Sequence, residues 1–279
     1  MPITAPLARQ VSGLLPDELA RFERDGLVIP RTRLPETICA EMRTALDETL
    51  LATAGTPPES LVCPHIPMMS GVPERVAQKW LSFAALPEIL DRVESAIGRD
   101  IVLWGAQVFC KPAATGMEVP WHQDGEYWPI RPLATCSAWI AIDDVDVENG
   151  AMSYIPGSHR ARELFAHLLS GRDDLALNRV LDPDCFDPGL ARYDELRAGE
   201  FSLHDVYLVH GSAANRSKRR RAGFVARFMP ASSHFDRSLS IDAGSKHFQT
   251  RFAERPIFLM RGDARSNMTN LVDSRGLHA

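Results

Sequence analysis

Hydrophobic residues in the first hundred positions recur with the spacing of amphipathic helices. Segment 36–54 shows this most clearly, with apolar side chains four residues apart at Ile38, Met42, Leu46 and Leu50. One face of the segment is therefore apolar, as in a helix that packs on a core. Similar patterns predict helices over 17–25, which Gly26 stops, and over 87–100. The proline-rich segment 56–75 is predicted to be a loop.

From residue 101 the pattern changes to short runs of β-branched and aromatic residues. Turn-forming residues separate the runs, which cover 101–111, 134–145, 151–158, 205–212 and 222–230. This pattern predicts an all-β sandwich or barrel and not alternating strand and helix units. One helix is predicted at 161–170, before an irregular stretch over 171–198. The residues after 230 are mixed and polar and predict no definite element.

The predicted fold is mainly β with flanking helices. We expect one domain over residues 1–279, in which a helical N-terminal layer (about 1–100) packs on a β-core (about 101–230). A C-terminal extension (about 231–279) follows the core. No repeat or linker divides the chain, and barrels of this length are commonly single domains.

Composition and charge exclude some partners. The chain has 279 residues, 45% of them hydrophobic and 24% charged, which is ordinary for a globular protein. The formal net charge of -5 gives no general electrostatic reason to bind nucleic acid or an anionic membrane. We expect neither as a partner. The sequence does not indicate an oligomeric state.

Cysteine usage bears on location. The five cysteines are scattered and form no CxxC pair, which argues against a disulfide framework or a cysteine–zinc module and favours a reducing compartment. The N-terminus has no apolar run typical of a secretory signal, and no stretch is long and apolar enough to span a bilayer. The expected location is the cytoplasm.

The candidate chemistry begins in the sequence VPWHQDGEYW at 119–128. In an extended strand, His122 and Asp124 point to the same side and can reach one metal ion, because side chains alternate along a strand. Two histidines and one carboxylate on one face leave coordination positions open and suit Fe(II). His210, which ends the apolar run DVYLV, is the predicted third ligand.

A second H-x-D sequence, His234 to Asp236, shows that this pattern is weak evidence alone. An isolated copy is more often a surface feature than a metal site. We favour the first copy because His122 lies between apolar residues at the start of the β-rich region, whereas His234 lies in a polar loop. The first copy also has His210 as a partner on another predicted strand.

The basic run RSKRRR at 216–221 permits two interpretations. It is either a solvated surface or a nucleic-acid contact, or it leads one arginine into the barrel, because an apolar strand follows directly. A dicarboxylate that chelates iron at one end needs a cation for its far carboxylate, and arginine offers a bidentate, permanently charged group. Arg221, eleven residues after His210, is placed for this role.

Together these residues resemble the phytanoyl-CoA dioxygenase (PhyH) family of Fe(II)- and 2-oxoglutarate-dependent oxygenases. The matching blocks are FERDGLVI at 22–29, KP at 111–112, HQDGEYWPIRP at 122–132, AW at 138–139, ENG at 148–150, IPGSH at 155–159, and HGSAANRS followed by Arg221. They follow the family's order and cover most of the chain. The resemblance implies a double-stranded β-helix (jelly-roll, cupin-like) core with Fe(II) as cofactor and 2-oxoglutarate and O2 as cosubstrates.

The resemblance also implies residue roles. His122, Asp124 and His210 would form the catalytic iron centre, and Arg221 with Ser212 would hold the far carboxylate of 2-oxoglutarate. Family members that halogenate carry Ala or Gly where this chain has Asp124. The carboxylate therefore favours hydroxylation, or a related desaturation or ring formation, with release of succinate and CO2.

Two further positions match residues that line the cosubstrate in the family. They are Gln107 and Trp139. An aromatic residue in an apolar strand is as often part of the core, so both interpretations of Trp139 stay open. Gln107 needs a polar partner if it faces inward.

The substrate is expected to be a small organic molecule. Tyr127, Trp128 and Arg131 follow the metal-binding strand and are candidates to line the pocket mouth, although loop aromatics equally often cap a barrel. His65, in VCPHIP, is a second candidate, with a surface loop as the alternative. Two other classes stay open: a cupin-like zinc or manganese hydrolase or isomerase, and a non-catalytic binding protein on the same fold.

Overall fold

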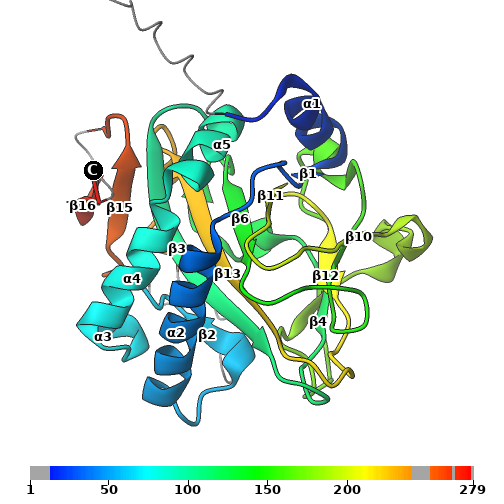
Figure 1. The fold of residues 1–279 in the computed structure, drawn as a ribbon. Helices are drawn as coiled ribbons and strands as arrows, with labels where there is room; N and C mark the ends of the chain where they lie inside the picture. Colours follow the sequence, from blue (N-terminus) through cyan, green and yellow to red (C-terminus); the bar gives the residue numbers. More distant parts are fainter. Residues whose placement is uncertain (1–12, 240–251, 266–267, 278–279) are drawn as a thin grey trace, which may run out of the picture.

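The computed structural model describes residues 13–239, 252–265 and 268–277, and within these ranges two sheets form a jelly-roll core (Figure 1). The larger sheet has the order β1-β11-β6-β13-β3-β15-β16, with β2 also paired to β3. Its strands are β1 (Leu27–Val28), β2 (Leu61–Val62), β3 (Ile101–Lys111), β6 (Cys136–Ala141), β11 (Phe201–Asp205), β13 (Arg221–Pro230), β15 (Ile257–Arg261) and β16 (Leu271–Asp273).

The smaller sheet has the order β10-β7-β12-β4. It consists of β10 (Arg192–Asp194), β7 (Met152–Tyr154), β12 (His210–Ser212) and β4 (Val119–His122). Two short antiparallel pairs flank the core: β5 (Ile130–Arg131) with β14 (His234–Phe235), and β8 (His167–Leu169) with β9 (Arg179–Leu181). The predicted mainly β fold is confirmed.

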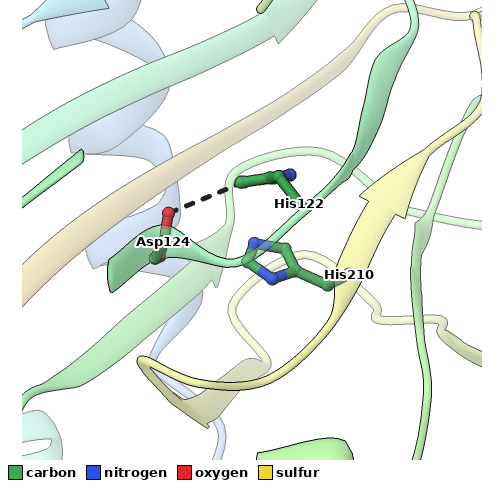
Figure 2. A group of neighbouring side chains, drawn as sticks. All are labelled: His122, Asp124 and His210. Carbon is green, nitrogen blue, oxygen red and sulfur yellow. Dashed lines mark ion pairs between the residues drawn. The ribbon is translucent and has the colours of Figure 1, made fainter. Parts of the chain in front are cut away.

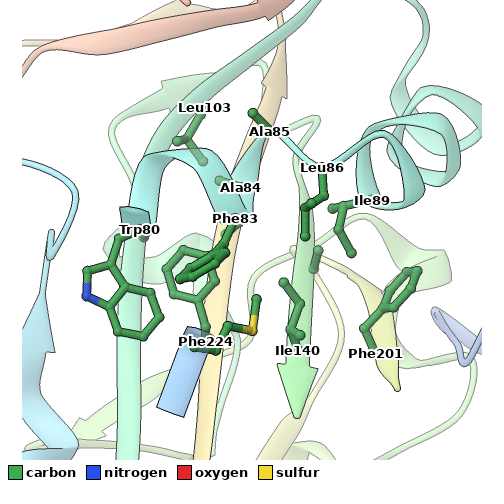
Figure 3. Packing of buried hydrophobic residues seen from close by; sticks show 14 of the residues in the cluster. Trp80, Phe83, Ala84, Ala85, Leu86, Ile89, Leu103, Ile140, Phe201 and Phe224 are labelled. Atoms are coloured by element: carbon green, nitrogen blue, oxygen red, sulfur yellow. The ribbon is translucent and has the colours of Figure 1, made fainter. Parts of the chain in front are cut away.

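The N-terminal helices cover one face of the larger sheet (Figure 1). They are α1 (Pro16–Asp25), α2 (Glu36–Ala52), α3 (Pro67–Ser70), α4 (Glu74–Ala84) and α5 (Pro87–Ile97). On α4, the ring centre of Trp80 lies 4.9 Å from the ring centre of Phe224 on β13 and 5.6 Å from that of Phe83 (Figure 3). The predicted helical layer is confirmed. No helix in the described ranges is long and apolar enough to cross a membrane.

Strand β13 separates the two faces of the sheet by alternation, since successive side chains of a strand point to opposite sides. The face toward the helices carries Ala222, Phe224, Ala226 and Phe228. The opposite face carries Arg221, Gly223, Val225 and Arg227, of which Arg221, Val225 and Arg227 line a cavity between the sheets. The strand thus belongs to the hydrophobic core on one side and to the candidate site on the other.

The helix predicted over 161–170 is wrong. The chain there forms a 3-10 turn, η3 (Ser158–Ala161), and then strand β8, which pairs with β9. Arg162 has a φ of 53°, outside helical geometry. The backbone N–H of Phe165 donates to the Gln123 side chain, 2.7 Å away. These contacts with distant residues override the local helical pattern.

The proline-rich segment 56–75 is less irregular than predicted. It holds a 3-10 turn, η1 (Pro58–Ser60), strand β2 and the short helix α3, and helix α4 starts at Glu74. Prolines stand at the first positions of η1 and α3, where a missing N–H costs nothing because no helical partner exists for it.

The run DVYLV is not a continuous strand, contrary to the prediction. Strand β11 ends at Asp205, whose carboxylate accepts from the backbone N–H of Tyr207 (2.8 Å) and whose carbonyl accepts from that of Leu208 (3.1 Å). This turn carries the chain from the larger sheet to the smaller one. His210 therefore begins β12 and does not end a strand.

The residues after 230 also join the core, although no element was predicted there. β15 pairs antiparallel with β3, and β16 pairs parallel with β15. Figure 1 shows both at the edge of the larger sheet. Phe252 and Arg255, which precede β15, reach the cavity between the sheets.

Candidate active site

Three buried side chains converge at the end of the smaller sheet (Figure 2). His122 ends β4, Asp124 begins the 3-10 turn η2 (Asp124–Tyr127), and His210 begins β12. The antiparallel register sets His210 directly opposite His122. One ligand atom from each of the three residues lies within 4.8 Å of the others.

The H-x-D segment achieves this geometry although β4 stops at His122. Gln123 is extended, with φ -117° and ψ 130°, so the side chains before and after it point to the same side. Its own side chain points elsewhere and donates to the carbonyls of Glu163 (3.0 Å) and Tyr207 (2.8 Å). The prediction that one strand carries both ligands needs this correction: Asp124 lies just past the strand.

Hydrogen bonds orient both imidazoles. The Nδ1 atoms of His122 and His210 each lie 2.9 Å from a carbonyl, that of Pro120 and that of Leu208. A carbonyl only accepts, so each Nδ1 carries the proton and each Nε2 keeps a lone pair for a metal. Burial lowers the pKa of His210 to about 3, which keeps it neutral, as a metal ligand must be.

His204, on β11, also contacts the carboxylate and was not predicted. Its Nε2 lies 3.6 Å from Asp124 Oδ2, as the His122 Nε2 lies 3.6 Å from Asp124 Oδ1. Burial alone would raise the pKa of Asp124, but the contacts from His122 and His204 hold it well below its usual range. A single histidine in an apolar run carries no signal in the sequence that sets it apart from a core residue.

Arg221 and Ser212 line the same cavity as the three candidate ligands. Arg221 is buried, and its Nε and Nη2 donate to the carbonyl of Gly150. Its guanidinium carbon lies 5.3 Å from the ring centre of Trp139. Lys111 Nζ donates to the Ser212 hydroxyl at 2.7 Å, which leaves the hydroxyl proton free to donate. Among the described residues Arg221 Nη1 has no hydrogen-bond partner, so it can donate to a bound anion.

The other arginines of the basic run point outward. Arg219 pairs with Asp146, and Arg220 pairs with Asp143 at 2.9 Å. Arg216 is exposed. The run therefore forms no continuous basic surface, and only Arg221 turns into the barrel, as one of the two interpretations predicted.

Gln107 and Trp139 both line the cavity. The Gln107 amide donates to the carbonyl of Glu59 at 3.2 Å and accepts from Arg227 Nη2 at 3.2 Å. Trp139 lies over Gly223, where a Cβ atom would come within 2.2 Å of the indole. Both residues face inward, so neither is part of the core under the helices.

Of the four residues predicted to contact substrate, two line the cavity and two do not. Tyr127 and Trp128 line the cavity, and burial raises the pKa of Tyr127, so its phenol stays protonated. Arg131 does not line it: the side chain is exposed and donates to the carbonyls of Trp128 and Ile130. His65 does not line it either. It is buried and packs on Phe258 with ring centres 5.3 Å apart, so the surface-loop interpretation is wrong.

Sequence reasoning also missed the end of the cavity away from Arg221. Arg227, Trp104, Phe252 and Arg255 line it there. Arg227 could have been predicted to face the cavity, because it stands an even number of positions after Arg221 on one strand and so shares its face. Arg255 had none, since its position depends on how the C-terminal strands join the sheet.

The second H-x-D sequence forms no comparable site. His234 is exposed on β14, and the Asp236 carboxylate accepts from the backbone and hydroxyl of Ser238. Across the part of the chain that the structure describes, His122, Asp124 and His210 are the one group with metal-binding geometry.

Comparison with known proteins gives consistent matches. Residues 22–223 match the family described as phytanoyl-CoA dioxygenase (PhyH). Peroxisomal phytanoyl-CoA dioxygenase from Bos taurus is 29% identical over 161 residues, which cover 55% of this chain and 47% of that protein. A probable alpha-ketoglutarate-dependent hypophosphite dioxygenase from Stutzerimonas stutzeri is 30% identical over 136 residues, 48% of this chain and 47% of that protein.

Solved structures share the fold. The non-haem alpha-ketoglutarate-dependent carbocyclase SnoK from nogalamycin biosynthesis is 25% identical with a TM-score of 0.61, and the match covers 80% of this chain and 86% of that one. The non-haem monooxygenase ThoJ is 25% identical with a TM-score of 0.59, over 88% and 84% of the two chains. The matched part spans about half the length of most of the curated relatives.

Proposed function

The chain belongs to the phytanoyl-CoA dioxygenase (PhyH) family, and we propose that it is an Fe(II)- and 2-oxoglutarate-dependent dioxygenase that oxidises a small organic molecule. One observation carries the proposal. The metal-binding group of His122, Asp124 and His210 shares a cavity with the inward-turned guanidinium of Arg221. A metal site and a carboxylate site within one enclosure are what a chelating dicarboxylate needs.

The donor set fits Fe(II). Two neutral imidazoles and one carboxylate from one side of the ion leave the remaining positions for a chelating cosubstrate and O2. When bound, iron with 2-oxoglutarate and O2 supplies the oxidising power, and the cosubstrate leaves as succinate and CO2. The protein holds the metal, orients the cosubstrate and keeps water from the reacting groups.

Arg221 and Ser212 are the proposed partners of the far carboxylate of 2-oxoglutarate. The Arg221 guanidinium is fixed through Gly150, and the Ser212 hydroxyl is fixed by Lys111. Trp139 stacks beside Arg221 and limits where the carboxylate can lie. We propose that Trp139 and Gln107 contribute to the wall of this subsite.

Asp124 supports hydroxylation, or desaturation or ring formation, over halogenation. With iron bound, its carboxylate would take the coordination position that a halide needs. Tyr127 and Trp128 are the proposed substrate contacts from the turn after the ligands, since both line the cavity.

A cupin-like hydrolase or isomerase would use the same three ligands but has no need for a buried arginine facing the site. A non-catalytic binding protein would tolerate the loss of a ligand, and all three are present. Neither alternative is favoured by the family match.

The cavity draws residues from every part of the chain, which supports our proposal of a single domain. Cys63 comes from the N-terminal layer, Trp139 from the β-core and Phe252 from the C-terminal extension. We also propose a cytoplasmic location, supported by five cysteines that are all free thiols. Mammalian relatives are named peroxisomal, so microscopy of the tagged protein tests this proposal.

The function is tested by anaerobic addition of Fe(II) and 2-oxoglutarate. We expect a weak visible metal-to-ligand charge-transfer band in the wild type that disappears in His122→Ala. Admission of O2 should then release succinate and CO2. Absence of the band in the wild type, or its persistence in the variant, contradicts the proposal.

A further inference from the structure

We propose that Arg227 and Arg255 form a second anion-binding subsite in the cavity, which holds an acidic group of the substrate. The inference rests on the proposed function, because it assigns a substrate class to the same enclosure. It concerns two arginines that neither the metal site nor the cosubstrate site uses.

The two arginines lie away from the proposed 2-oxoglutarate subsite. Arg227 stands six positions after Arg221 on β13, on the same inward face. A strand advances about 3.3 Å per residue, so their backbones lie on the order of 20 Å apart. Their guanidinium groups lie beside different indole rings, that of Arg221 by Trp139 and that of Arg227 by Trp128, so we expect each to bind an anion of its own.

The candidate ligands lie between these two ends. Val119 of β4 pairs with Ser212, at the Arg221 end, and the chain then passes through His122 and Asp124. It next reaches Trp128, whose ring centre lies 5.5 Å from the Arg227 guanidinium carbon. A substrate anchored near Arg227 would therefore extend toward the metal from the side opposite Arg221.

Neither arginine has an acidic partner. Within the described ranges no carboxylate forms an ion pair with Arg227 or Arg255, and the Nε of each is buried without a hydrogen-bond partner. The charge of Asp124 acts on the Arg227 guanidinium, but the two carboxylate oxygens contact His122 and His204 and form no ion pair with Arg227. Cations enclosed without a counter-charge are costly, and a bound anion removes that cost.

Gln107 positions one of the two groups. Its amide oxygen accepts from Arg227 Nη2, and its amide nitrogen is held by the carbonyl of Glu59, each at 3.2 Å. Arg255 is fixed differently, with its guanidinium carbon 5.0 Å from the ring centre of Phe252. Its Nη1 lies over Gly105, at 3.6 Å from where a Cβ would stand.

The surroundings of the two guanidiniums are aromatic. Trp104 contacts Trp128 with ring centres 4.7 Å apart, and Phe252 lies beyond at the same end of the cavity. Two forked donors within apolar walls match a planar or tetrahedral anion on an apolar body. The substrate class is an organic acid, either a carboxylate or a phosphate ester, with an alkyl or aromatic body.

The test compares probes that differ in their head group. They are 3-phenylpropionate, 2-phenylethyl phosphate and the neutral 3-phenylpropionamide. Each is titrated anaerobically into protein with Fe(II) and saturating 2-oxoglutarate, so that Arg221 is occupied, and binding is read from the charge-transfer band. Tryptophan fluorescence of metal-free protein gives a second readout, because Trp104 and Trp128 line the cavity.

We expect at least one acid to bind the wild type about tenfold or more tightly than the amide, since charge-assisted hydrogen bonds are the strong ones. Arg227→Gln and Arg255→Gln should each weaken acid binding by about tenfold to a hundredfold and leave the amide unchanged. The lysine variants should retain part of the preference. Arg99→Gln removes an exposed charge, 72% accessible, and should change nothing.

The inference is overturned if the amide binds as tightly as both acids, if no probe binds, or if the double glutamine variant keeps the acid preference. Tighter binding of the carboxylate or of the phosphate identifies the head group. Loss of the charge-transfer band from the wild type refutes the proposed function instead, and the fluorescence titration then still decides the anion subsite.

Discussion

His122 and His210 face each other across the β4–β12 pair, with ring centres 4.2 Å apart. Each is fixed by a bond from Nδ1 to a carbonyl two residues earlier in its own chain segment. The two proposed ligands are therefore oriented without a metal, and Asp124 completes the candidate set from the adjoining turn.

Replacement of either histidine by alanine should weaken Fe(II) binding by more than about a hundredfold, because loss of a ligand exceeds the roughly 10–100-fold cost of losing an outer-shell partner. Anaerobic Fe(II) titration measures the effect. His234→Ala is the matched control, since it changes the histidine of the other H-x-D sequence, and it should bind iron like the wild type. Equal losses in His122→Ala and His234→Ala would contradict the site.

His204 should act as a positioning residue for Asp124. Its Nε2 lies 3.6 Å from Asp124 Oδ2 and limits how the carboxylate can turn. His204→Ala should weaken Fe(II) binding by about 10- to 100-fold, and His204→Gln, which keeps a donor, should lose less. Anaerobic titration gives both affinities. A His204→Ala protein that binds iron normally would show that the contact is only structural.

Gly223 should matter for 2-oxoglutarate and not for iron. In Gly223→Ala the new Cβ would lie 2.2 Å from the Trp139 indole, which must move and disturb its stacking on Arg221. This displacement should weaken 2-oxoglutarate binding roughly tenfold, or by about 1.4 kcal/mol, as read from titration of the charge-transfer band. Gly171→Ala, with nothing within 4 Å of its Cβ, is the control. Unchanged affinity in Gly223→Ala would mean that Trp139 takes no part.

Asp194 should make stability depend on pH. It is buried on β10, accepts from the Ser202 hydroxyl at 2.6 Å, and burial raises its pKa to about 6. Between about pH 4 and 6, Asp194 holds a proton in the folded protein that the unfolded chain has already released. Its contribution to the free energy of unfolding therefore falls as pH rises. Over this pH range the free energy of unfolding should fall by roughly 3 kcal/mol, at about 1.4 kcal/mol per pKa unit.

Asp194→Asn should remove this fall in the free energy of unfolding with rising pH. Urea unfolding of both proteins at several pH values should show the variant gaining relative stability from pH 4 to pH 7. A constant difference between the two proteins over this range would contradict the raised pKa.

Several parts of the site followed from residue chemistry alone. His122, Asp124 and His210 could be proposed as ligands because few residue types bind iron and an extended segment sets His122 and Asp124 on one side. The second H-x-D sequence has the same spacing, so the choice also needed the β-rich surroundings of His122 and the partner His210 on another predicted strand. Arg221 was predictable because a charged side chain at the start of an apolar strand must turn either to solvent or to a ligand. Its neighbours Arg219 and Arg220 turn to solvent, where they pair with Asp146 and Asp143.

Other parts depended on contacts between distant residues. The segment 161–170 has a helical pattern, yet pairing of β8 with β9 made it extended. The run DVYLV is apolar throughout, yet the turn at Asp205 breaks it where the chain changes sheets. In both cases tertiary packing overrides the local preference. For the helical segment that preference is only a few tenths of a kcal/mol per residue on intrinsic helix scales.

The sequence by itself determined the alternation of β13 and the choice of three candidate metal ligands, because periodicity and ligand chemistry are properties of the residues. Only the tertiary structure decided which ring stands opposite His122, that His204 reaches Asp124, and that Arg255 joins Arg227 in the same cavity. Those relationships depend on strand register and sheet order. They are set by the packing of the whole chain and have no counterpart in any short stretch of it.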